Sequence, residues 1–408
     1  MRRVLIFSLN YYPFVGGAEV AIKEITDRLS PDEYEFHLLA PHYRKELQRE
    51  EKIGAVTVHR YGLSKKEATI TDQSKLPLKL NKYLYQLTAH RKAEQLHRQY
   101  QFDATWAMMA HATAIPAGKF KKRHPEIPYL LTLQEGDPPE YIEHLMKPVW
   151  TSFVEGFTRA DYIQAISTFL LAWGRRMGFT GEGTVVPNAV DTKRFMTKPS
   201  DDQIQAIRKR FGIENGDIVL VTTSRLVHKN AVDDVIRALP LVDERVVFVV
   251  CGIGPDEEKL KALVAELHLE ERVRFVGQVE HSDLPAVLHG SDIFIRPSRS
   301  EGMGNSFIEA MAASVPVIAT QEGGISDFLY DEKKNPDKKT TGWAVSKDAP
   351  GEIAEAIADI LSRPEKVQEV TKDAVALVQK TYDWETVARD MDDIFKQLTP
   401  KEAEPDTI

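Results

Sequence analysis

The feature that most limits the possible folds of this chain is a regular alternation of short apolar runs with longer runs of helical apolar spacing. Residues 3–9 are expected to form a buried strand, and residues 17–30 have the spacing of a helix. The further expected strands cover residues 34–40, 55–61, 103–109, 128–133, 161–167, 217–224, 245–252, 272–277, 292–298, 316–320 and 342–345. Strands that alternate with helices predict right-handed βαβ units and parallel sheets.

The alternation runs through both halves of the chain, which predicts an α/β protein of two doubly wound domains that face each other. A length of 408 residues also exceeds one typical core. Pro187 and Asn188 break the pattern between the halves, so the boundary is expected within residues 183–195. We therefore expect domains at residues 1–187 and 188–382.

The composition excludes several classes of protein. The only cysteine, Cys251, rules out an intramolecular disulfide and favours a reducing compartment. No stretch approaches the ~18 apolar residues of a membrane span. The first apolar run ends at Asn10, which is too short for the core of a signal peptide. We expect a cytoplasmic protein that does not span a membrane.

Charge is unevenly divided between the halves, and its distribution favours an anionic partner for the first half only. Residues 1–190 carry 25 Lys and Arg against 21 Asp and Glu, whereas residues 191–408 carry 28 against 40. The expected helix at residues 76–99 is basic and amphipathic. In and just before it, the apolar residues Leu76, Leu80, Tyr83, Leu84 and Leu87 alternate with the cations Lys75, Lys79, Lys82, Arg91 and Lys92. Such a helix either packs its apolar face on the sheet, which we favour, or lies on an anionic membrane at the inner face.

Four strand-to-helix loops stand where α/β sheets bind ligands, at the carboxyl ends of strands. In the first loop, Gly16 and Gly17 let the backbone approach a ligand, or else serve tight packing. In the third, Gly252 and Gly254 leave room for a flat group such as a nucleobase edge, or form a tight turn before Pro255. The first loop does not have the G-x-G-x-x-G spacing of a nicotinamide site.

The second loop places two cations four residues apart. Arg225 offers a fork of donors and Lys229 a point charge, and this combination suits a diphosphate. The alternative is a pair of solvated surface cations. The position after a strand and before a helix favours ligand binding.

The fourth loop places carboxylates on both sides of a glycine-containing turn. Glu301 precedes Gly302 and Gly304, and Glu309 lies inside the apolar run that follows. An unpaired glutamate in so apolar a run would be costly, which argues against a purely structural role. Two acceptor groups can grip vicinal hydroxyls at both ends of a nucleotide sugar, the hexose at one and the ribose at the other.

With these residues in view, the chain resembles the retaining glycosyltransferases of family 4, which have the GT-B architecture of two Rossmann-like domains. The segment from Glu301 to Glu309 matches the E-x7-E motif of that family. "SRLVHKN" is similar to its G-R-L-x-x-x-K-G segment, with Ser224 and Asn230 in place of glycines. "VVPNAVDTKRF" and "NYYPFVGGAE" resemble its hinge and N-terminal glycine loop. The last helix, expected at residues 383–398, resembles the one that crosses back onto the first domain.

The resemblance implies a division of labour in which the first domain binds the acceptor and the second binds the donor. Arg225 and Lys229 would hold the donor diphosphate, Glu309 the ribose, and Glu301 the sugar, while Gly17 approaches the phosphates from the opposite domain. The donor-binding residues expected from the loops and the resemblance together are Gly16, Gly17, Arg225, Lys229, Gly252, Gly254, Gly302, Met303, Gly304, Asn305, Ser306 and Glu309.

The implied reaction moves a hexosyl group from a UDP- or GDP-type nucleotide sugar to a glycan or lipid-linked acceptor with retained configuration. Arg225 and Lys229 can stabilise the leaving diphosphate, so we expect no metal and no cofactor. The D-x-D at Asp390 and Asp392 is expected on a solvated helix face. The leaving phosphate is thought to take the acceptor's proton. No nucleic-acid partner is expected.

The acceptor side departs from the family pattern. Gln134 stands where many relatives carry a histidine, and glutamine cannot act as a base. Glu135 and Asp137 are expected either to contact acceptor or donor or to cap a helix. His111 matches a second family histidine, or is a structural one. The predicted catalytic residues are Glu301, Arg225, Lys229, His111 and Glu135.

Two other functions remain alternatives. One is a nucleotide-sugar epimerase or a phosphorylase of the same fold, although no lysine is marked for the pyridoxal phosphate of a phosphorylase. The other is a nucleotide-sugar-binding protein without transfer activity.

Overall fold

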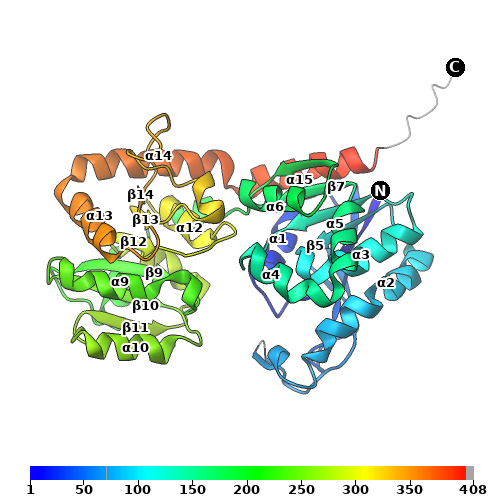
Figure 1. The fold of residues 1–408 in the computed structure, drawn as a ribbon, viewed down its shortest axis with the longest axis horizontal. Coiled ribbons are helices and arrows are strands. Elements are labelled where there is room, and N and C mark those ends of the chain that lie inside the picture. The colour runs from blue at the N-terminus through cyan, green and yellow to red at the C-terminus, as the bar shows by residue number, and fades with distance from the viewer. Residues whose placement is uncertain (70, 401–408) are drawn as a thin grey trace. The chain divides into compact units, whose positions relative to one another are not determined.

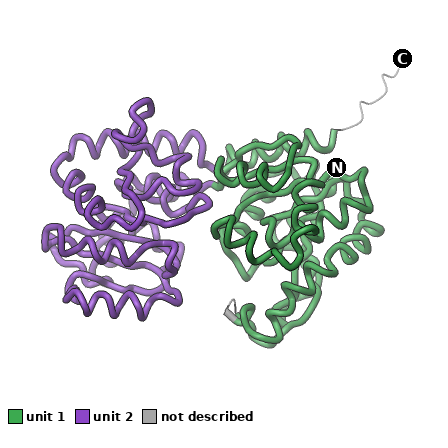
Figure 2. The backbone as a smooth tube through the Cα atoms, viewed as in Figure 1, with its two compact units in different colours: residues 1–188, 384–408 green, residues 189–383 purple. Residues whose placement is uncertain are grey.

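The computed structural model describes residues 1–69 and 71–400, and they form two compact units. The first unit contains Met1–Asn188 together with the C-terminal helix that begins at Trp384, and the second contains Ala189–Asp383 (Figure 2). Each unit is a mainly parallel sheet between helices (Figure 1). The prediction of two doubly wound α/β domains is therefore confirmed.

The sheet of the first unit has the strand order β3-β4-β2-β1-β5-β6-β7-β8, and only β3 and β4 pair antiparallel. The strands are β1 Arg2–Phe7, β2 Tyr34–Pro41, β3 Glu50–Ile53, β4 Val56–Tyr61, β5 Ala104–Met108, β6 Tyr129–Leu133, β7 Tyr162–Ala165 and β8 Glu182–Val185. The helices are α1 Gly17–Thr26, η1 Thr71–Ser74, α2 Leu80–Tyr100, α3 Ala110–Arg123, α4 Pro139–Met146, η2 Lys147–Val149, α5 Trp150–Thr158, α6 Thr168–Arg176 and α15 Trp384–Leu398.

The sheet of the second unit has the strand order β11-β10-β9-β12-β13-β14, and every pair in it is parallel. The strands are β9 Ile218–Thr223, β10 Val246–Cys251, β11 Val273–Gly277, β12 Ile293–Arg296, β13 Val317–Ala319 and β14 Trp343–Ala344. The helices are α7 Thr192–Met196, α8 Asp201–Arg210, η3 His228–Asn230, α9 Val232–Ala238, η4 Leu239–Leu241, α10 Glu257–Glu266, η5 His281–Asp283, α11 Leu284–His289, α12 Asn305–Ala312, η6 Gly323–Asp327, α13 Pro350–Ser362 and α14 Pro364–Thr381.

The helix α15 returns the chain to the first unit because one of its faces is strongly apolar. Its buried residues are Trp384, Val387, Ala388, Met391, Ile394 and Phe395. The Tyr34 hydroxyl donates to Asp392 at 2.6 Å, and Lys396 donates to the same carboxylate at 2.6 Å. Asp392 therefore helps to fix α15 on β2, which corrects the expectation that it lies on a solvated face.

The helix α2 differs from its prediction in its start and in its buried face. It begins at Leu80 and not at residue 76, because Pro77 has no N–H and disfavours helix at the residue before it. The residues that α2 buries are Asn81, Tyr85, Ala89, His90, Ala93 and Leu96, a stripe at helical spacing. Leu80, Tyr83, Leu84 and Leu87 are 38% to 60% exposed. The prediction that these apolar residues pack on the sheet is wrong.

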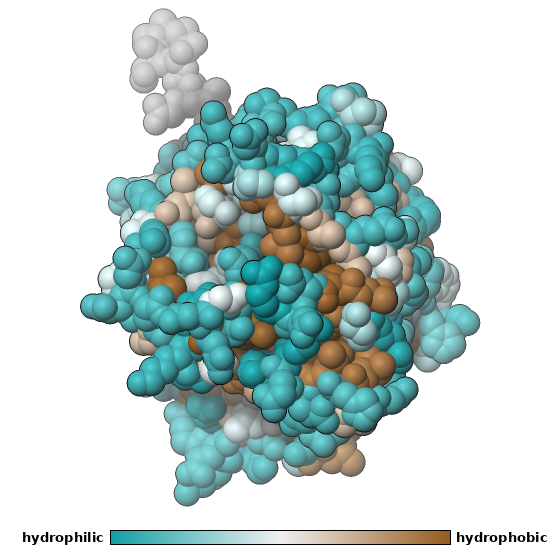
Figure 3. Space-filling model, turned by 90° about the vertical axis from the view of Figure 1, so that its left-hand side faces the viewer, coloured by the Kyte–Doolittle hydropathy of each residue, from teal (hydrophilic) through white to brown (hydrophobic). Residues whose placement is uncertain are grey.

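Large exposed apolar side chains occur on both units, for example Leu87 on the first and Leu241 on the second. The face drawn in Figure 3 is mainly hydrophilic, with apolar side chains gathered in one central area. Within the described residues, no helix is both long and apolar enough to cross a membrane.

Candidate active site

The order of strands in the second unit defines where its ligand site is expected. From β9 the chain continues to β10 and β11 on one side, and then returns to β12, which pairs with β9 on the other side. This reversal is a topological switch point, where open α/β sheets bind ligands at the carboxyl ends of their strands. The loops after β9 and β12 meet there, because the Arg299 backbone N–H donates to the Lys229 carbonyl at 2.7 Å. The structure thus brings the loop of Arg225 and Lys229 against the loop of Glu301.

The loop after β9 is held from within by Asn230. The Asn230 side chain is buried and donates from Nδ2 to the Arg225 carbonyl at 2.7 Å. Ala231, next along the chain, has a φ of 54°. The Arg225 side chain remains exposed. Asn230 therefore gives the turn an internal support that the glycine of the family pattern does not have, and the sequence reasoning did not find it.

The glycines after β10 support this same loop. A Cβ on Gly252 would lie 1.8 Å from the Ser224 carbonyl oxygen, and one on Gly254 would lie 2.2 Å from that of Leu226. The space beside both glycines is therefore filled by the protein's own backbone. This corrects the expectation that the missing side chains leave room for a nucleobase, although a backbone contact with the donor stays a proposal.

The Glu301 carboxylate is fixed at both oxygens. Arg296 donates from Nη2 to Oε2 at 2.8 Å, and the Gly302 N–H donates to Oε1 at 3.1 Å. Arg296 also donates from Nη1 to the Ser306 hydroxyl at 2.8 Å. The sequence reasoning missed Arg296, and the only signal for it was an arginine at the end of an apolar strand.

The turn between Glu301 and α12 is shaped around the same arginine. Gly304 has a φ of 90°, and a Cβ there would lie 2.5 Å from Arg296 Nη2. Met303 is buried, and Asn305 begins α12 directly after Gly304. The N-cap residue of α12 is Gly304, so among the described residues this helix start has no side-chain cap. The Gly302 N–H is already used by Glu301, and the assignment of residues 302–306 to the donor stays a prediction.

Glu309 has a partner of its own, so it is not the unpaired carboxylate that the sequence suggested. Its Oε1 lies 3.3 Å from Nε2 of His281, which comes from η5. Arg194 donates to the other ring nitrogen of His281 at 2.8 Å and also to the His281 carbonyl. Because Nδ1 accepts, Nε2 carries the proton and donates to Glu309. The contact with His281 therefore orients the Glu309 carboxylate, whose side chain is 13% exposed.

The first unit has its own switch point, between β1 and β5. The glycine loop follows β1, and His111 follows β5, so both stand at this edge of the sheet. Gly16 donates its N–H to Glu19 at 2.6 Å and closes the N-terminus of α1, and burial raises the pKa of Glu19. Nothing lies within 4 Å of a Cβ placed on Gly17. Gly17 is thus the glycine with an open side, and Gly16 serves the helix.

Glu135 stands behind His111. Its side chain is 0% exposed, and it accepts from the N–H of Gln134 at 2.9 Å and from the N–H of His111 at 3.3 Å. Oε1 also lies 3.5 Å from Nδ1 of His111, whose side chain is 21% exposed. The Gln134 side chain is buried and donates to Asn188. The expectation that Glu135 contacts the acceptor or donor directly is therefore corrected to a supporting position, and His111 is the exposed member.

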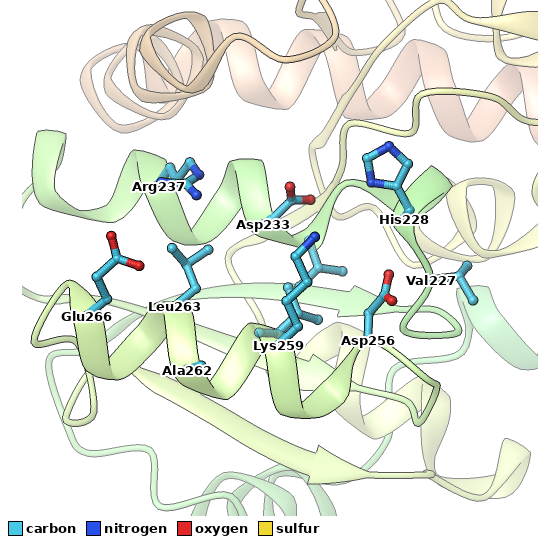
Figure 4. A pocket seen from close by; sticks show the side chains of 11 residues that line it. Val227, His228, Asp233, Arg237, Asp256, Lys259, Ala262, Leu263 and Glu266 are labelled. Atoms are coloured by element: carbon cyan, nitrogen blue, oxygen red, sulfur yellow. The ribbon is translucent and has the colours of Figure 1, made fainter.

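A cavity of about 240 Å³ lies outside this site, between α9 and α10. Figure 4 shows Asp233 and Arg237 on one side of it and Lys259, Leu263 and Glu266 on the other. Val227 and His228 of the loop after β9 line this cavity as well. Within residues 1–69 and 71–400, no group of three or more His, Cys, Asp or Glu side chains is placed to hold a metal ion.

Two family models match the chain in consecutive parts. The model of Glycosyltransferase Family 4 matches residues 15–194, and that of Glycosyl transferases group 1 matches residues 203–377. Together they cover both units. The chain belongs to the family 4 glycosyltransferases, as its E-x7-E motif and glycine loop predicted.

Curated relatives carry related names. A GDP-mannose-dependent alpha-(1-6)-phosphatidylinositol monomannoside mannosyltransferase of Mycobacterium tuberculosis is 29% identical over 60% of this chain and 61% of the relative. The alpha-monoglucosyldiacylglycerol synthase of Acholeplasma laidlawii is 21% identical over 98% of each chain.

Solved structures of the same fold include Anabaena HepE in complex with UDP and glucose, with a TM-score of 0.74 and 19% identity over 97% of this chain and 100% of that chain. Sucrose-phosphate synthase from Thermosynechococcus elongatus has a TM-score of 0.77 and 19% identity over 98% of this chain and 99% of that chain. These likenesses confirm the GT-B fold.

Proposed function

We propose that this protein transfers a hexosyl group from a nucleoside diphosphate sugar to a glycan or lipid-linked acceptor, with retained configuration and without a metal ion. The observation that carries the proposal is the meeting of two loops at the switch point between β9 and β12. One loop presents Arg225 and Lys229, and the other presents Glu301 ahead of Glu309. Cations beside carboxylates suit a ligand that is phosphorylated at one point and rich in hydroxyls at others.

The second unit binds the donor in this proposal. Arg225 and Lys229 hold the diphosphate, Glu309 accepts from the ribose hydroxyls, and Glu301 accepts from the sugar. During transfer the bond from the anomeric carbon to the phosphate oxygen breaks, and a bond to the acceptor oxygen forms on the same face. The leaving diphosphate gains charge, which Arg225 and Lys229 stabilise, and it takes the acceptor's proton.

The first unit binds the acceptor. His111 is partly exposed at the carboxyl edge of its sheet, and Glu135 is in place to orient the imidazole. A histidine held in this way can contact the hydroxyl of an acceptor or of the donor sugar. A Cβ on Gly17 would meet nothing within 4 Å, so the backbone there is open to a ligand.

The acceptor class is suggested by two relatives named for phosphatidylinositol monomannoside and for diacylglycerol. On this chain, Leu80, Tyr83 and Leu87 of α2 are 43%, 54% and 60% exposed, with Lys75 and Lys79 nearby in sequence. The segment from α4 to α5 adds Tyr141, Leu145, Val149 and Trp150, all of them exposed. Apolar side chains among lysines suit the surface of an anionic membrane, so we place this unit at an inner membrane face.

The first experiment is a thermal-shift panel of nucleotides and nucleotide sugars, with and without chelator, on wild type and Glu309→Ala. A ligand at 100 times its dissociation constant adds about 2.7 kcal/mol of stability, which is easily seen. We expect one UDP- or GDP-sugar to stabilise wild type equally with chelator, and the variant to respond much less. Transfer is then assayed with that donor, and the anomeric configuration of the product is read by NMR. Binding without hydrolysis or transfer would favour the binding-only alternative, and no response to any nucleotide would refute the proposal.

The membrane contact is tested by co-sedimentation with vesicles of anionic phospholipid. Leu80→Ser with Leu87→Ser is expected to weaken binding, and 0.5 M salt to weaken it further. Leu241→Ser is the matched control, because Leu241 is 62% exposed on the second unit. Equal sedimentation of all three proteins would refute the contact.

A further inference from the structure

Arg296 is a buried cation behind Glu301. It is the last residue of β12, its side chain is 7% exposed, and the residues before it in the strand are apolar. Its guanidinium lies over the Phe307 ring, with Cζ 4.1 Å from the ring centre. Gly304 leaves the room that Nη2 occupies. The backbone of the loop is thus built around this guanidinium.

The hydrogen bonds of Arg296 to described side chains connect two points of the site loop. Nη2 donates to Glu301, and Nη1 donates to Ser306, each at 2.8 Å. Together with the Gly302 N–H, these contacts hold the Glu301 carboxylate in one orientation. The Arg296 hydrogen bonds do not extend to Arg225 or Lys229 within residues 1–69 and 71–400.

Stability alone does not account for an arginine at this position. Burying an ion pair costs desolvation energy that the attraction between the charges often only repays, and apolar side chains of similar volume frequently stabilise as well or better. Burial lowers the pKa of Arg296, and the charges of Glu301 and Glu309 oppose that fall. What the arginine supplies, and an apolar residue would not, is the position of a carboxylate.

We propose that Arg296 is a positioning residue that holds the Glu301 carboxylate in the orientation the donor sugar requires, without touching the donor itself. This inference rests on the proposed function, which assigns Glu301 to the sugar. It predicts a separation of two properties. Loss of Arg296 impairs transfer of the sugar but does not weaken binding of the nucleoside diphosphate, which Arg225, Lys229 and Glu309 provide.

The test compares wild type, Arg296→Met, Arg296→Lys and Glu301→Gln in two measurements. One is the affinity for the nucleoside diphosphate, UDP or GDP, found by the panel; the other is kcat/KM for transfer from the matching nucleotide sugar. We expect Arg296→Met to bind the diphosphate within about twofold of wild type and to lose at least tenfold in kcat/KM. Arg296→Lys recovers part of the loss. The double variant with Glu301→Gln loses no more than the larger single loss, because both changes remove one interaction.

Each result has a definite meaning. A merely structural role would weaken diphosphate binding and transfer together and would give no rescue by lysine, which would overturn the inference. Arg274→Met is the control, since Arg274 lies on β11 at the edge of the same sheet and donates to the Glu270 carbonyl at 3.0 Å. Should Arg296→Met fail to fold, Ser306→Ala removes one partner of the guanidinium, and unchanged transfer in that variant overturns the inference. If wild type itself neither binds nor uses a nucleotide sugar, the proposed function fails. If wild type and Arg296→Met are both fully active, only the inference about Arg296 fails.

Discussion

Arg299 joins two halves of the candidate site through Lys229, whose carbonyl accepts the Arg299 N–H at 2.7 Å. The Arg299 guanidinium continues the connection. It donates to the His228 carbonyl at 2.7 Å and reaches both Asp233 and Asp234 at the start of α9. The backbone and the side chain of Arg299 therefore both connect the loop of Glu301 to the loop of Lys229, although neither the motif nor the glycine pattern marks this residue.

Arg299→Met is expected to lower stability and to weaken nucleotide binding. Its side chain is 13% exposed, and its removal leaves Asp233 and the nearly buried Asp234 without their cation. Breaking a largely buried ion pair of this kind costs roughly 2 kcal/mol after allowance for the exposed partners. Urea unfolding measures the loss, and Arg245→Met is the control, since its pair with Asp243 is exposed. Unchanged unfolding in Arg299→Met would mean that the loops hold their positions without it.

Glu309→Gln is expected to weaken binding of the nucleoside diphosphate about tenfold, or about 1.4 kcal/mol, because a charge-assisted acceptor of ribose hydroxyls becomes a neutral one. His281→Ala should lower the affinity less, since it frees the Glu309 carboxylate without removing it. Isothermal titration with the diphosphate measures both effects. Inorganic pyrophosphate is the control ligand, because it lacks the ribose. Equal weakening for pyrophosphate would place Glu309 at the phosphates and contradict its assignment.

Glu135→Gln is expected to lower transfer by roughly 10- to 100-fold while leaving donor binding unchanged. The glutamine has the same shape and keeps one of the two oxygens that accept from the N–H groups of Gln134 and His111. The variant lacks the negative charge that faces the His111 ring. A histidine that is not held in the correct orientation is a poor proton donor, proton acceptor and hydrogen-bond partner. Glu140→Gln is the control, since Glu140 is exposed on α4. Full activity of Glu135→Gln would restrict this carboxylate to a structural role.

The sequence predicted the inner strands well because buried parallel strands are continuous apolar runs, as in Val246–Cys251. It missed β3 and β8, which lie at the sheet edges and alternate exposed with half-buried residues. Charged or glycine-containing edge strands have no apolar signature. The reason is different for α2, where the stripe of Leu80, Tyr83, Leu84 and Leu87 is exposed and a second stripe, which contains Tyr85 and Leu96, is buried.

In the candidate site, sequence reasoning found the residues that follow strands and missed those that support them. Arg225, Lys229 and Glu301 are marked by their place after an apolar run. Arg296 and Arg299 are not, because their partners are fixed by the pairing of β12 with β9 and by the return of the loop toward α12. The spacing of residues in the sequence does not predict such contacts, because they form only when the sheet packs.

Stability is expected to fall as the pH falls from about 6.5 toward 4, because of two buried histidines in the first unit. His37 Nδ1 lies 2.9 Å from His59 Nε2, with Glu35 and Glu50 at the outer ends of the pair. Burial lowers the pKa of His37, and burial with the charge of His37 lowers that of His59 to about 4. The unfolded chain binds protons near pH 6.5, so below that value it gains protons that the folded state refuses. The stabilisation is complete above the unfolded pKa and is lost as the pH approaches the folded one.

Urea midpoints at pH 7.5 and 5.0 measure the fall. His59→Gln should reduce the difference between the two midpoints, whereas His268→Gln, on the second unit, should leave it unchanged. Equal pH dependence in wild type and His59→Gln would assign the acid sensitivity to other groups.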